Sequence, residues 1–393
     1  MTTLLEHATA LQPKLTRLRR DIHRHPELGF RETRTAATAA RHVAELGFTV
    51  RTGVGRTGVV AELTSGTGPT VALRADMDAL PIHEENDVEY RSTIDGVMHA
   101  CGHDAHVAML IGAAEILAGR QGRGELPAGT VRLLFQPSEE MSDEENRSGA
   151  MRMVEDGAMD GVDAVFGLHV GAHLPFGRCF LRAGPYMAGS VTMRGTVHGQ
   201  SAHAGRPHEG VDGIVLAAHA ILAVQNAVAR RIPPGSAAVV HFGRVHGGNA
   251  ENILASRVEL GGTIRYFDRD VLAMLKREVT RAFEVVDALG GRGEIEFRDG
   301  YPPVLNDEAM TALAREAITA TLGPGAIGEQ EPSMPSEDFA VLLERAPGTF
   351  FWLGAALEHP REHHSPDFDI DERVLPLGSA ALAACAVERL RRG

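Results

Sequence analysis

Apolar, β-rich segments alternate with helical segments between residues 58 and 168, and this alternation limits the folds open to the chain. The apolar runs are 58–63, 70–73, 131–135 and 164–168. A helical segment at 106–117 separates the second run from the third, and another at 150–155 separates the third from the fourth. Strands that alternate with helices predict an α/β fold with a largely parallel sheet covered by helices. Polar groups that follow such strands gather at one edge of the sheet.

A second domain is predicted where this rhythm changes. Strand-like and helical segments follow one another at 190–197, 210–230, 237–245, 257–266, 270–288 and 293–298. The order βαββαβ is typical of a compact two-layer sandwich. A chain of 393 residues is also longer than one ordinary core. We therefore expect a discontinuous first domain, 1–183 and 301–393, with an inserted domain at 184–300.

Composition excludes several classes of protein. The formal net charge is −13 and no basic block occurs, which argues against a nucleic-acid partner. The sequence has no run of about 18 apolar residues, so no membrane span is expected. Residues 1–20 have helical spacing without the features of a signal peptide. Cys101, Cys179 and Cys385 are too few for a disulfide framework. We expect a cytoplasmic protein.

Cys101 and His103 form the first candidate metal motif. Gly102 stands between them, and a turn there would let both side chains reach one pair of ions. A thiolate and an imidazole suit zinc and similar metals, and a thiolate can bridge two ions. Asp104 could orient an imidazole. The alternative is a helix N-terminus with Asp104 as its cap and histidines of no special role.

Glu139 and Glu140 follow the third apolar run and the turn at Pro137. Two adjacent carboxylates on an irregular segment point in different directions, so one could bind a metal while the other acts as a base. The alternative is an exposed acidic turn, as we expect for the neighbouring residues 143–145.

Three histidines are further candidate ligands, and two aspartates follow a strand of the same predicted sheet. His169 ends the fourth apolar run, and Asp76 and Asp78 follow the second. His169 is equally typical of a core histidine. His363 and His364 lie in a polar loop, where chemistry alone does not decide between them.

Other chemistries find less support. Residues 53–58 match G-x-G-x-x-G, but 59–63 read as a strand, whereas dinucleotide binding needs a helix there. The H-E-x-x-H helix and the G-x-S-x-G elbow are absent from the sequence. His203 and Arg265 lie in the inserted domain; the arginine could pair with a substrate carboxylate, or it could be a surface residue of the sheet.

The ligand types together indicate hydrolysis. Water bound to a divalent cation loses a proton near neutral pH, and a nearby carboxylate can accept it. The sequence thus predicts a metal-dependent hydrolase.

Ordered motifs then add a family resemblance. They are RRDIHRHPELG at 19–29, RADMDALP at 74–81, MHACGHD at 98–104, LFQPSEE at 134–140, GLHV at 167–170, SAHA at 201–204, PH at 207–208, SEDF at 336–339 and HSP at 364–366. The chain resembles the M20 metallopeptidases, in the amidohydrolase branch of hippurate hydrolases, N-acyl-amino-acid amidohydrolases and plant indole-3-acetyl-amino-acid hydrolases. One departure is the segment 141–147, where the family usually has a glycine-rich stretch.

The resemblance implies a fold and a metal centre. The fold is a zinc-exopeptidase-like (phosphorylase/hydrolase-like) catalytic domain with an inserted ferredoxin-like lid, through which two copies form a homodimer. Two divalent ions, Zn²⁺ or Mn²⁺ and alternatively Co²⁺ or Ni²⁺, would be held by Cys101, His103, Glu140, His169 and His364. His364 is preferred over His363 because the family's ligand directly precedes Ser-Pro.

The resemblance also implies roles in the reaction. Glu139 would be the general base and acid, and Asp78 would orient a ligand. His203 would reach the partner's active site and polarise the substrate carbonyl. Asn252 and Arg265 would hold the carboxylate end of the substrate.

The expected reaction is hydrolysis of the amide bond of a small N-acyl amino acid. Two alternatives stay open. One is a dipeptidase or carboxypeptidase of the same family. The other is a metal- or substrate-binding protein without turnover, which would not need the base Glu139.

Overall fold

The computed structural model describes residues 3–393, which fold as two compact units. The first unit contains the chain up to Tyr186, Leu305–Glu331 and Asp338–Gly393. The second contains Met187–Val304 and Pro332–Glu337. The second unit thus begins and ends close to 184 and 300, and it also includes a short segment from much later in the sequence.

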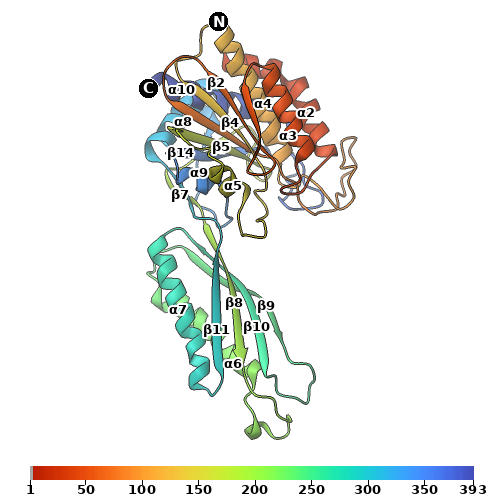
Figure 1. The fold of residues 1–393 in the computed structure, drawn as a ribbon, viewed down its shortest axis with the longest axis vertical. Coiled ribbons are helices and arrows are strands. Elements are labelled where there is room, and N and C mark those ends of the chain that lie inside the picture. Colours follow the sequence, from red (N-terminus) through yellow and green to blue (C-terminus); the bar gives the residue numbers. More distant parts are fainter. Residues whose placement is uncertain (1–2) are drawn as a thin grey trace. The chain divides into compact units, whose positions relative to one another are not determined.

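The first unit is built on an eight-stranded sheet of order β1-β2-β4-β3-β5-β14-β6-β13 (Figure 1). Its strands are β1 (Thr49–Val54), β2 (Gly58–Thr64), β3 (Thr70–Asp76), β4 (Thr130–Gln136), β5 (Ala164–Gly171), β6 (Cys179–Phe180), β13 (Ile327–Gly328) and β14 (Gly348–Gly354). The central strands β4, β3, β5 and β14 are parallel, as predicted.

The sheet is mixed rather than largely parallel, because β2 pairs antiparallel with both β1 and β4. Only residues 65–69 connect β2 to β3. A parallel arrangement needs a crossover of a dozen or more residues. The short loop therefore makes β3 run opposite to β2, and β4, parallel to β3, also runs opposite to β2.

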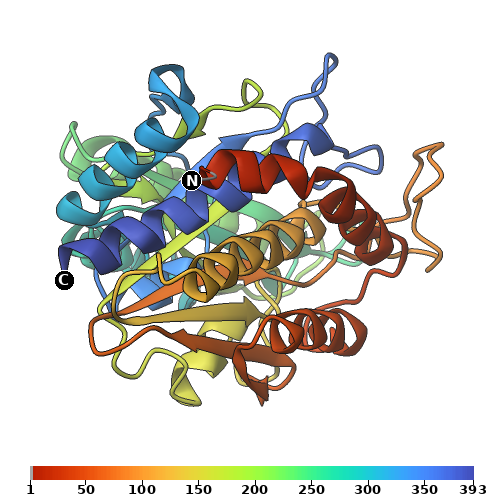
Figure 2. The same ribbon diagram turned by 90° about the horizontal axis from the view of Figure 1, so that it is seen from above.

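Helices cover this sheet. They are α1 (Leu4–Ala10), α2 (Gln12–Arg24), α3 (Thr33–Glu45), α4 (His103–Gly122), α5 (Gly149–Glu155), α8 (Glu308–Leu322), α9 (Phe339–Leu343) and α10 (Leu375–Arg392), with short 3₁₀ helices at Pro324–Ala326 and Glu372–Val374. Figure 2 shows α4 side by side with α10 and the N-terminal helices. Helix α4 is covered by its neighbouring helices and by the sheet, and it is buried at almost every position from His103 to Leu117.

Two helix boundaries differ from the predictions. The single N-terminal helix is divided into α1 and α2, because Pro13 stands in the first turn of α2 and has no N–H to continue a helix. The helix predicted at 106–117 begins three residues earlier, at His103. Gly102 turns the chain into this helix with φ 89°, and a Cβ there would lie 2.4 Å from Val170 Cγ2. Only glycine fits this turn.

The second unit has the predicted order βαββαβ. Its elements are β8 (Gly189–His198), α6 (Gly213–Arg231), β9 (Ala238–Gly247), β10 (Arg257–Tyr266), α7 (Arg269–Ala288) and β11 (Arg292–Asp299), with a 3₁₀ turn at Pro207–Glu209. The antiparallel sheet has the order β11-β8-β10-β9. Short strands β7 (Gly184–Met187) and β12 (Val304–Asn306) lie where the chain passes between the units. The core of this unit joins α6 and α7 to the sheet through side chains such as Leu216, Val258 and Phe283.

Helix α6 is long and apolar enough to cross a membrane by length and composition alone. In the fold, Leu216, Ala220 and Val224 belong to the core of the second unit, so the helix also has the pattern of a core helix. Ile214 and Leu222 remain exposed, at 52% and 66% of their surface.

Candidate metal centre

The expected metal ligands come from distant parts of the sequence and meet at one edge of the first unit's sheet. Strands β4, β3 and β5 are parallel neighbours, so their carboxyl ends lie together. The ligands are Glu140 after β4, His169 near the end of β5, Cys101 and His103 at the start of α4, and His364 after β14.

Their donor atoms form overlapping sets, each with all atoms within 4.8 Å of one another. One set is Cys101, His103 and His169, and a second is Cys101, Glu140 and His364. Ligands around a tetrahedral zinc ion lie about 3.4–3.8 Å apart, so each set could close around one cation through shifts of about 1 Å. Because Cys101 belongs to both sets, it could contribute to holding either ion.

Two imidazoles each turn one ring nitrogen toward this cluster. The Nδ1 of His169 donates to the Val170 carbonyl at 2.8 Å, so the lone pair of the neutral ring is on Nε2. This Nε2 lies 3.3 Å from Cys101 Sγ. The Nδ1 of His103 lies 3.2 Å from Asp78 Oδ1, while its buried Nε2 has no hydrogen-bond partner among the described residues. A buried polar atom without a partner is costly, and a cation would satisfy it. The donor set therefore fits a pair of divalent metals.

Asp78 connects two of the expected ligands. Its Oδ1 holds the His103 ring, and its Oδ2 accepts a hydrogen bond from the Glu140 backbone N–H at 3.0 Å. The carboxylate is buried, with 1% of its surface exposed. A carboxylate that orients a metal-binding histidine fixes its tautomer and direction, so Asp78 is placed to do what the sequence predicts.

The electrostatics favour cation binding. Burial raises the pKa of the Cys101 thiol, and the carboxylates of Glu140 and Glu139 raise it further, well above its usual range. Burial lowers the pKa of His103, but Asp76 and Asp78 outweigh this effect and raise it to about 10. Both groups thus hold protons at neutral pH when no metal is bound. Metal binding displaces such protons, so we expect metal affinity to weaken as the pH falls.

The loop after β14 distinguishes its two histidines. The Nε2 of His363 accepts the Ala172 N–H at 3.2 Å, so this nitrogen is already engaged. The Nε2 of His364 lies 3.0 Å from Glu140 Oε1 and belongs to the second donor set. His364 has φ 61°, a left-handed conformation that is uncommon outside glycine. The backbone geometry therefore directs His364 toward the cluster.

The sequence analysis missed a chain of hydrogen bonds behind the ligands. The Val170 N–H donates to His106 Nε2 at 2.9 Å, so the proton of the neutral ring is on Nδ1, 2.5 Å from Asp76 Oδ1. Arg74 pairs with the other Asp76 oxygen. This chain holds the backbone next to His169. Asp76 stood in a recognised motif and His106 follows another by two residues, but no spacing rule indicated that they would meet.

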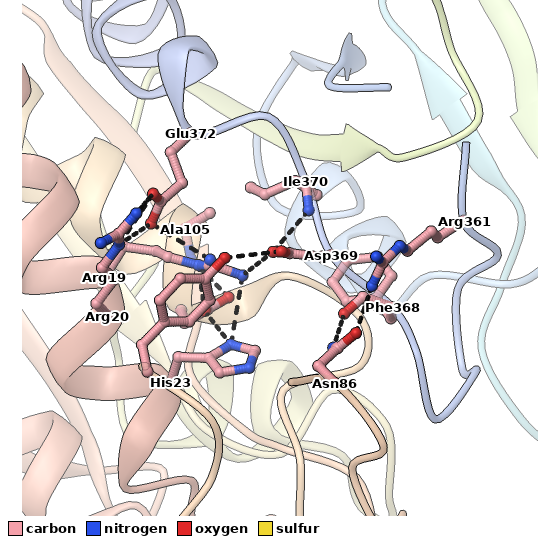
Figure 3. Close-up of polar contacts among 12 residues, drawn as sticks. Arg19, Arg20, His23, Asn86, Ala105, Arg361, Phe368, Asp369, Ile370 and Glu372 are labelled. Atoms are coloured by element: carbon pink, nitrogen blue, oxygen red, sulfur yellow. Dashed lines mark hydrogen bonds and ion pairs between the residues drawn. The ribbon is translucent and has the colours of Figure 1, made fainter. Parts of the chain in front are cut away.

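A buried ionic network anchors the start of α4 (Figure 3). Arg19 of α2 is fully buried and pairs with Asp104 at 2.7 Å, Asp369 at 3.0 Å and Glu372 at 3.3 Å. Asp104 also lies 2.7 Å from His23 Nδ1. Burial alone would raise the pKa of Asp104, but Arg19 and His23 hold it below its usual value. Asp104 thus orients the imidazole of His23 and holds the helix that bears His103.

Two of the expected substrate residues lie together in the second unit. The loop that carries His203 pairs with the segment after Asn252: the Ala204 N–H donates to the Asn252 carbonyl at 2.9 Å, and His203 forms a β-bridge with Ile253. The Gly205 N–H donates to His203 Nδ1 at 2.9 Å. A neutral His203 ring therefore carries its proton on Nε2, where it can act as a donor.

Arg265 lies elsewhere in the same unit. It is near the end of β10, and its Nη1 donates to Ser336 Oγ at 2.8 Å. His203 and Asn252 lie close to the other end, where β10 begins at Arg257. Eight residues of strand span about 27 Å at about 3.4 Å per residue. The structure therefore separates Arg265 from His203 and Asn252 within one copy of the chain.

Replacing Cys101 with serine is expected to remove at least one metal ion per subunit, because both donor sets lose their shared thiolate and a serine hydroxyl is a poor replacement. Elemental analysis of the purified variant measures this loss. Cys385→Ala is the matched control, since Cys385 is a buried thiol of α10 outside the cluster. Full occupancy of both sites in Cys101→Ser would contradict the assignment.

Two overlapping donor sets that could hold divalent cations, beside an additional carboxylate at the edge of an α/β sheet, are typical of a dinuclear metal-dependent hydrolase. The chain belongs to Peptidase family M20/M25/M40, whose model matches residues 72–388, and the predicted family resemblance is confirmed.

Three similar proteins indicate the class of reaction. The N-acetyl-L-cysteine deacetylase of Bacillus subtilis is 38% identical over 93% of this chain and 86% of its own length. Thermostable carboxypeptidase 1 of Saccharolobus solfataricus is 38% identical over 95% of both chains. The crystal structure of Bacillus subtilis YXEP, described as a dinuclear metal-binding peptidase of the M20 family, superposes with a TM-score of 0.84, at 34% identity and covering 97% and 99% of the two chains. The chain is a metal-dependent amide hydrolase.

Proposed function

We propose that this enzyme hydrolyses the amide bond of N-acyl amino acids, with Glu139 as general base and then general acid. The observation that carries the proposal is the place of Glu139. Its carboxylate lies within 4.8 Å of the donor atoms of His103 and Glu140, yet it belongs to neither donor set built around Cys101. It is also buried, with 7% of its surface exposed. Such a group is well placed to move protons beside the metals.

Cys101, His103, Glu140, His169 and His364 would hold the two ions. Bound divalent cations lower the pKa of water and polarise a carbonyl group. Glu139 accepts the proton of the attacking water and delivers it to the leaving amine nitrogen. Asp78 keeps His103 and the backbone of Glu140 in place during these transfers. The products are a carboxylic acid and a free amino acid.

The second unit would supply the remaining contacts. The Nε2–H of His203 would donate to the carbonyl oxygen as negative charge develops there, a type of contact that often contributes several kcal/mol. Arg265 and Asn252 would hold the substrate carboxylate. Because His203 and Asn252 lie far from Arg265 along β10, one small substrate could meet all three only if two copies of the chain contribute.

A homodimer through the second unit is therefore part of the proposal. Strand β9 is an edge of its sheet, and such an edge can pair with another strand. Val239 and Val245 on this strand are 41% and 53% exposed, and α6 adds the exposed Ile214 and Leu222. These apolar side chains suit a surface that a second copy covers.

A substrate panel tests the function. Chelator-treated enzyme would be reconstituted with Mn²⁺, Zn²⁺, Co²⁺ or Ni²⁺ and assayed with N-acetyl, N-benzoyl and indole-3-acetyl amino acids. We expect activity to depend on the added metal and to require the acyl group. Reconstituted enzyme that hydrolyses none of these compounds would refute the proposal.

A carboxypeptidase or dipeptidase is the second candidate, because one relative of 38% identity is named a carboxypeptidase. The two functions differ in whether a charged amine is tolerated next to the scissile amide. Matched substrates, such as a dipeptide and the same dipeptide N-acetylated, separate them. Faster cleavage of the dipeptide with the free amine would favour the second candidate.

A further inference from the structure

We infer that Glu32 is a positioning residue for the catalytic turn at 137–140, an inference that rests on the proposed role of Glu139. Two buried carboxyl groups accept the backbone N–H groups of the residues on either side of Glu139. Asp78 accepts the N–H of the residue after it, Glu140, at 3.0 Å, and Glu32 accepts the N–H of the residue before it, Ser138, at 2.8 Å. The backbone on both sides of the proposed base is thus held by a carboxyl oxygen.

The turn needs such support because its backbone is strained. Ser138 has φ 45°, in the left-handed region that L-residues with a Cβ seldom adopt. Strained conformations persist only where the surroundings determine them, and they cluster at functional sites. Ser138 is fully buried; its carbonyl accepts the Gly149 N–H at 2.9 Å, and its Oγ donates to the Met141 carbonyl at 2.9 Å.

Three glycines also pack their backbones against the same turn. A Cβ on Gly29 would lie 2.4 Å from Ser138 Oγ, one on Gly58 would lie 2.8 Å from Pro137 Cδ, and one on Gly149 would lie 1.5 Å from the Pro137 carbonyl oxygen. These contacts are too close for any side chain. The turn is therefore enclosed by backbone on several sides, and the Glu32 side chain supplies a hydrogen-bond acceptor to it.

Glu32 itself is held in a single arrangement. It precedes α3 and is fully buried. Its Oε1 also accepts the Phe30 N–H at 3.0 Å, and its Oε2 accepts the Thr57 hydroxyl at 2.5 Å. Burial, with the nearby charge of Asp78, raises the pKa of Glu32 to about 7. Since its bonds go to Phe30, Thr57 and Ser138, Glu32 would act on Glu139 through the backbone.

The test compares Glu32→Ala, Glu32→Gln and the control Thr57→Val in the metal-loaded enzyme. Removing the acceptor should release the Ser138 N–H and let Glu139 move, and a displacement near 1 Å can cost on the order of 100-fold in rate. We expect Glu32→Ala to lower kcat by about 10- to 100-fold, with KM changed by less than about threefold and both metals retained. Hydrogen–deuterium exchange in peptides covering 138–140 should become faster.

The two other variants separate positioning from burial alone. The amide oxygen of Glu32→Gln can still accept the Ser138 N–H, so this variant should keep kcat within about fivefold of the wild type and keep exchange slow. Thr57→Val removes only the hydroxyl contact and should change kcat by less than about threefold. If Glu32→Ala does not fold, Glu32→Asp, which withdraws the carboxylate by one methylene, takes its place with the same expectations.

The inference is overturned if the alanine variant keeps kcat and exchange near wild-type values, or if the glutamine variant loses as much activity as the alanine variant. It is also overturned if kcat falls while exchange at 138–140 stays slow. Failure of the proposed function has a different signature. A wild-type enzyme inactive on every N-acyl amino acid would refute that function, while the exchange measurement would still show whether Glu32 holds the turn.

Discussion

Glu139→Gln is expected to lower kcat at least roughly a thousandfold while both metal ions stay bound, more than the usual loss of an acid–base group because activation of water fails as well. Glutamine has nearly the same shape, but it cannot accept the proton of water or return one to the leaving amine. The ligands that share Cys101 do not include Glu139, so metal content should be preserved. Steady-state kinetics with the best N-acyl amino acid, together with elemental analysis, measure both quantities.

Glu144→Gln is the matched control for this substitution. Glu144 lies in the same acidic segment, its side chain is 74% exposed, and it pairs with Arg56 at 2.9 Å. Exposed ion pairs contribute little, so this variant should turn over at the wild-type rate. Near-normal turnover in Glu139→Gln would remove Glu139 from the mechanism, and loss of a metal ion would show that it is a ligand rather than a base.

Mixing two nearly inactive variants, His203→Ala and Glu139→Gln, is expected to restore about a quarter of the wild-type activity after subunit exchange. His203 and Arg265 are too far apart within one copy to contact the same small substrate, so the proposal assigns His203 to the partner's site. If His203 acts in the partner's site, each mixed dimer contains one site with both residues intact and one site with neither. Random exchange makes about half of the dimers mixed, and one of their two sites works.

The control for this experiment pairs Glu139→Gln with Cys101→Ser. Both changes fall in the first unit, so every site of a mixed dimer is defective and no activity should return. Native mass spectrometry shows whether mixed dimers form. Mixed dimers of His203→Ala and Glu139→Gln that stay inactive would place His203 in its own subunit's site, and a chain that is monomeric in light scattering would deny it a role across subunits.

Much of the fold was predictable because its signals are local. In the second unit, all six elements were expected in the observed order, and β10 has the predicted limits, Arg257–Tyr266. The buried side chains Leu275, Val279 and Phe283 of α7 recur at helical spacing, a pattern that is visible in the sequence. The direction of β2 was not predictable from its own residues, because strand direction depends on the length of the next connection and on which strand becomes the neighbour.

The metal cluster was predictable in its residue types, since thiol, imidazole and carboxylate groups at strand ends and at a helix start are what metals require. Its supporting groups were not. His106, Asp76 and Glu32 each have an ordinary alternative as core polar residues, and their roles depend on which backbone groups they meet. Arg265 shows the opposite case: its residue type suited a substrate carboxylate, but only the strand geometry separates it from His203.

The sequence by itself determined the chemistry available to this protein: one thiol, three imidazoles and two adjacent carboxyl groups, in motifs that resemble a family of amide hydrolases. Residue types, short motifs and periodicity are properties of neighbouring positions, so they can be read along one dimension. Only the tertiary structure decided that Cys101 is shared by two donor sets, that His364 offers its ring to the cluster while His363 is engaged, and that Glu32 and Asp78 hold the backbone around Glu139. These facts are distances between segments far apart in the chain, and packing and backbone hydrogen bonds set them.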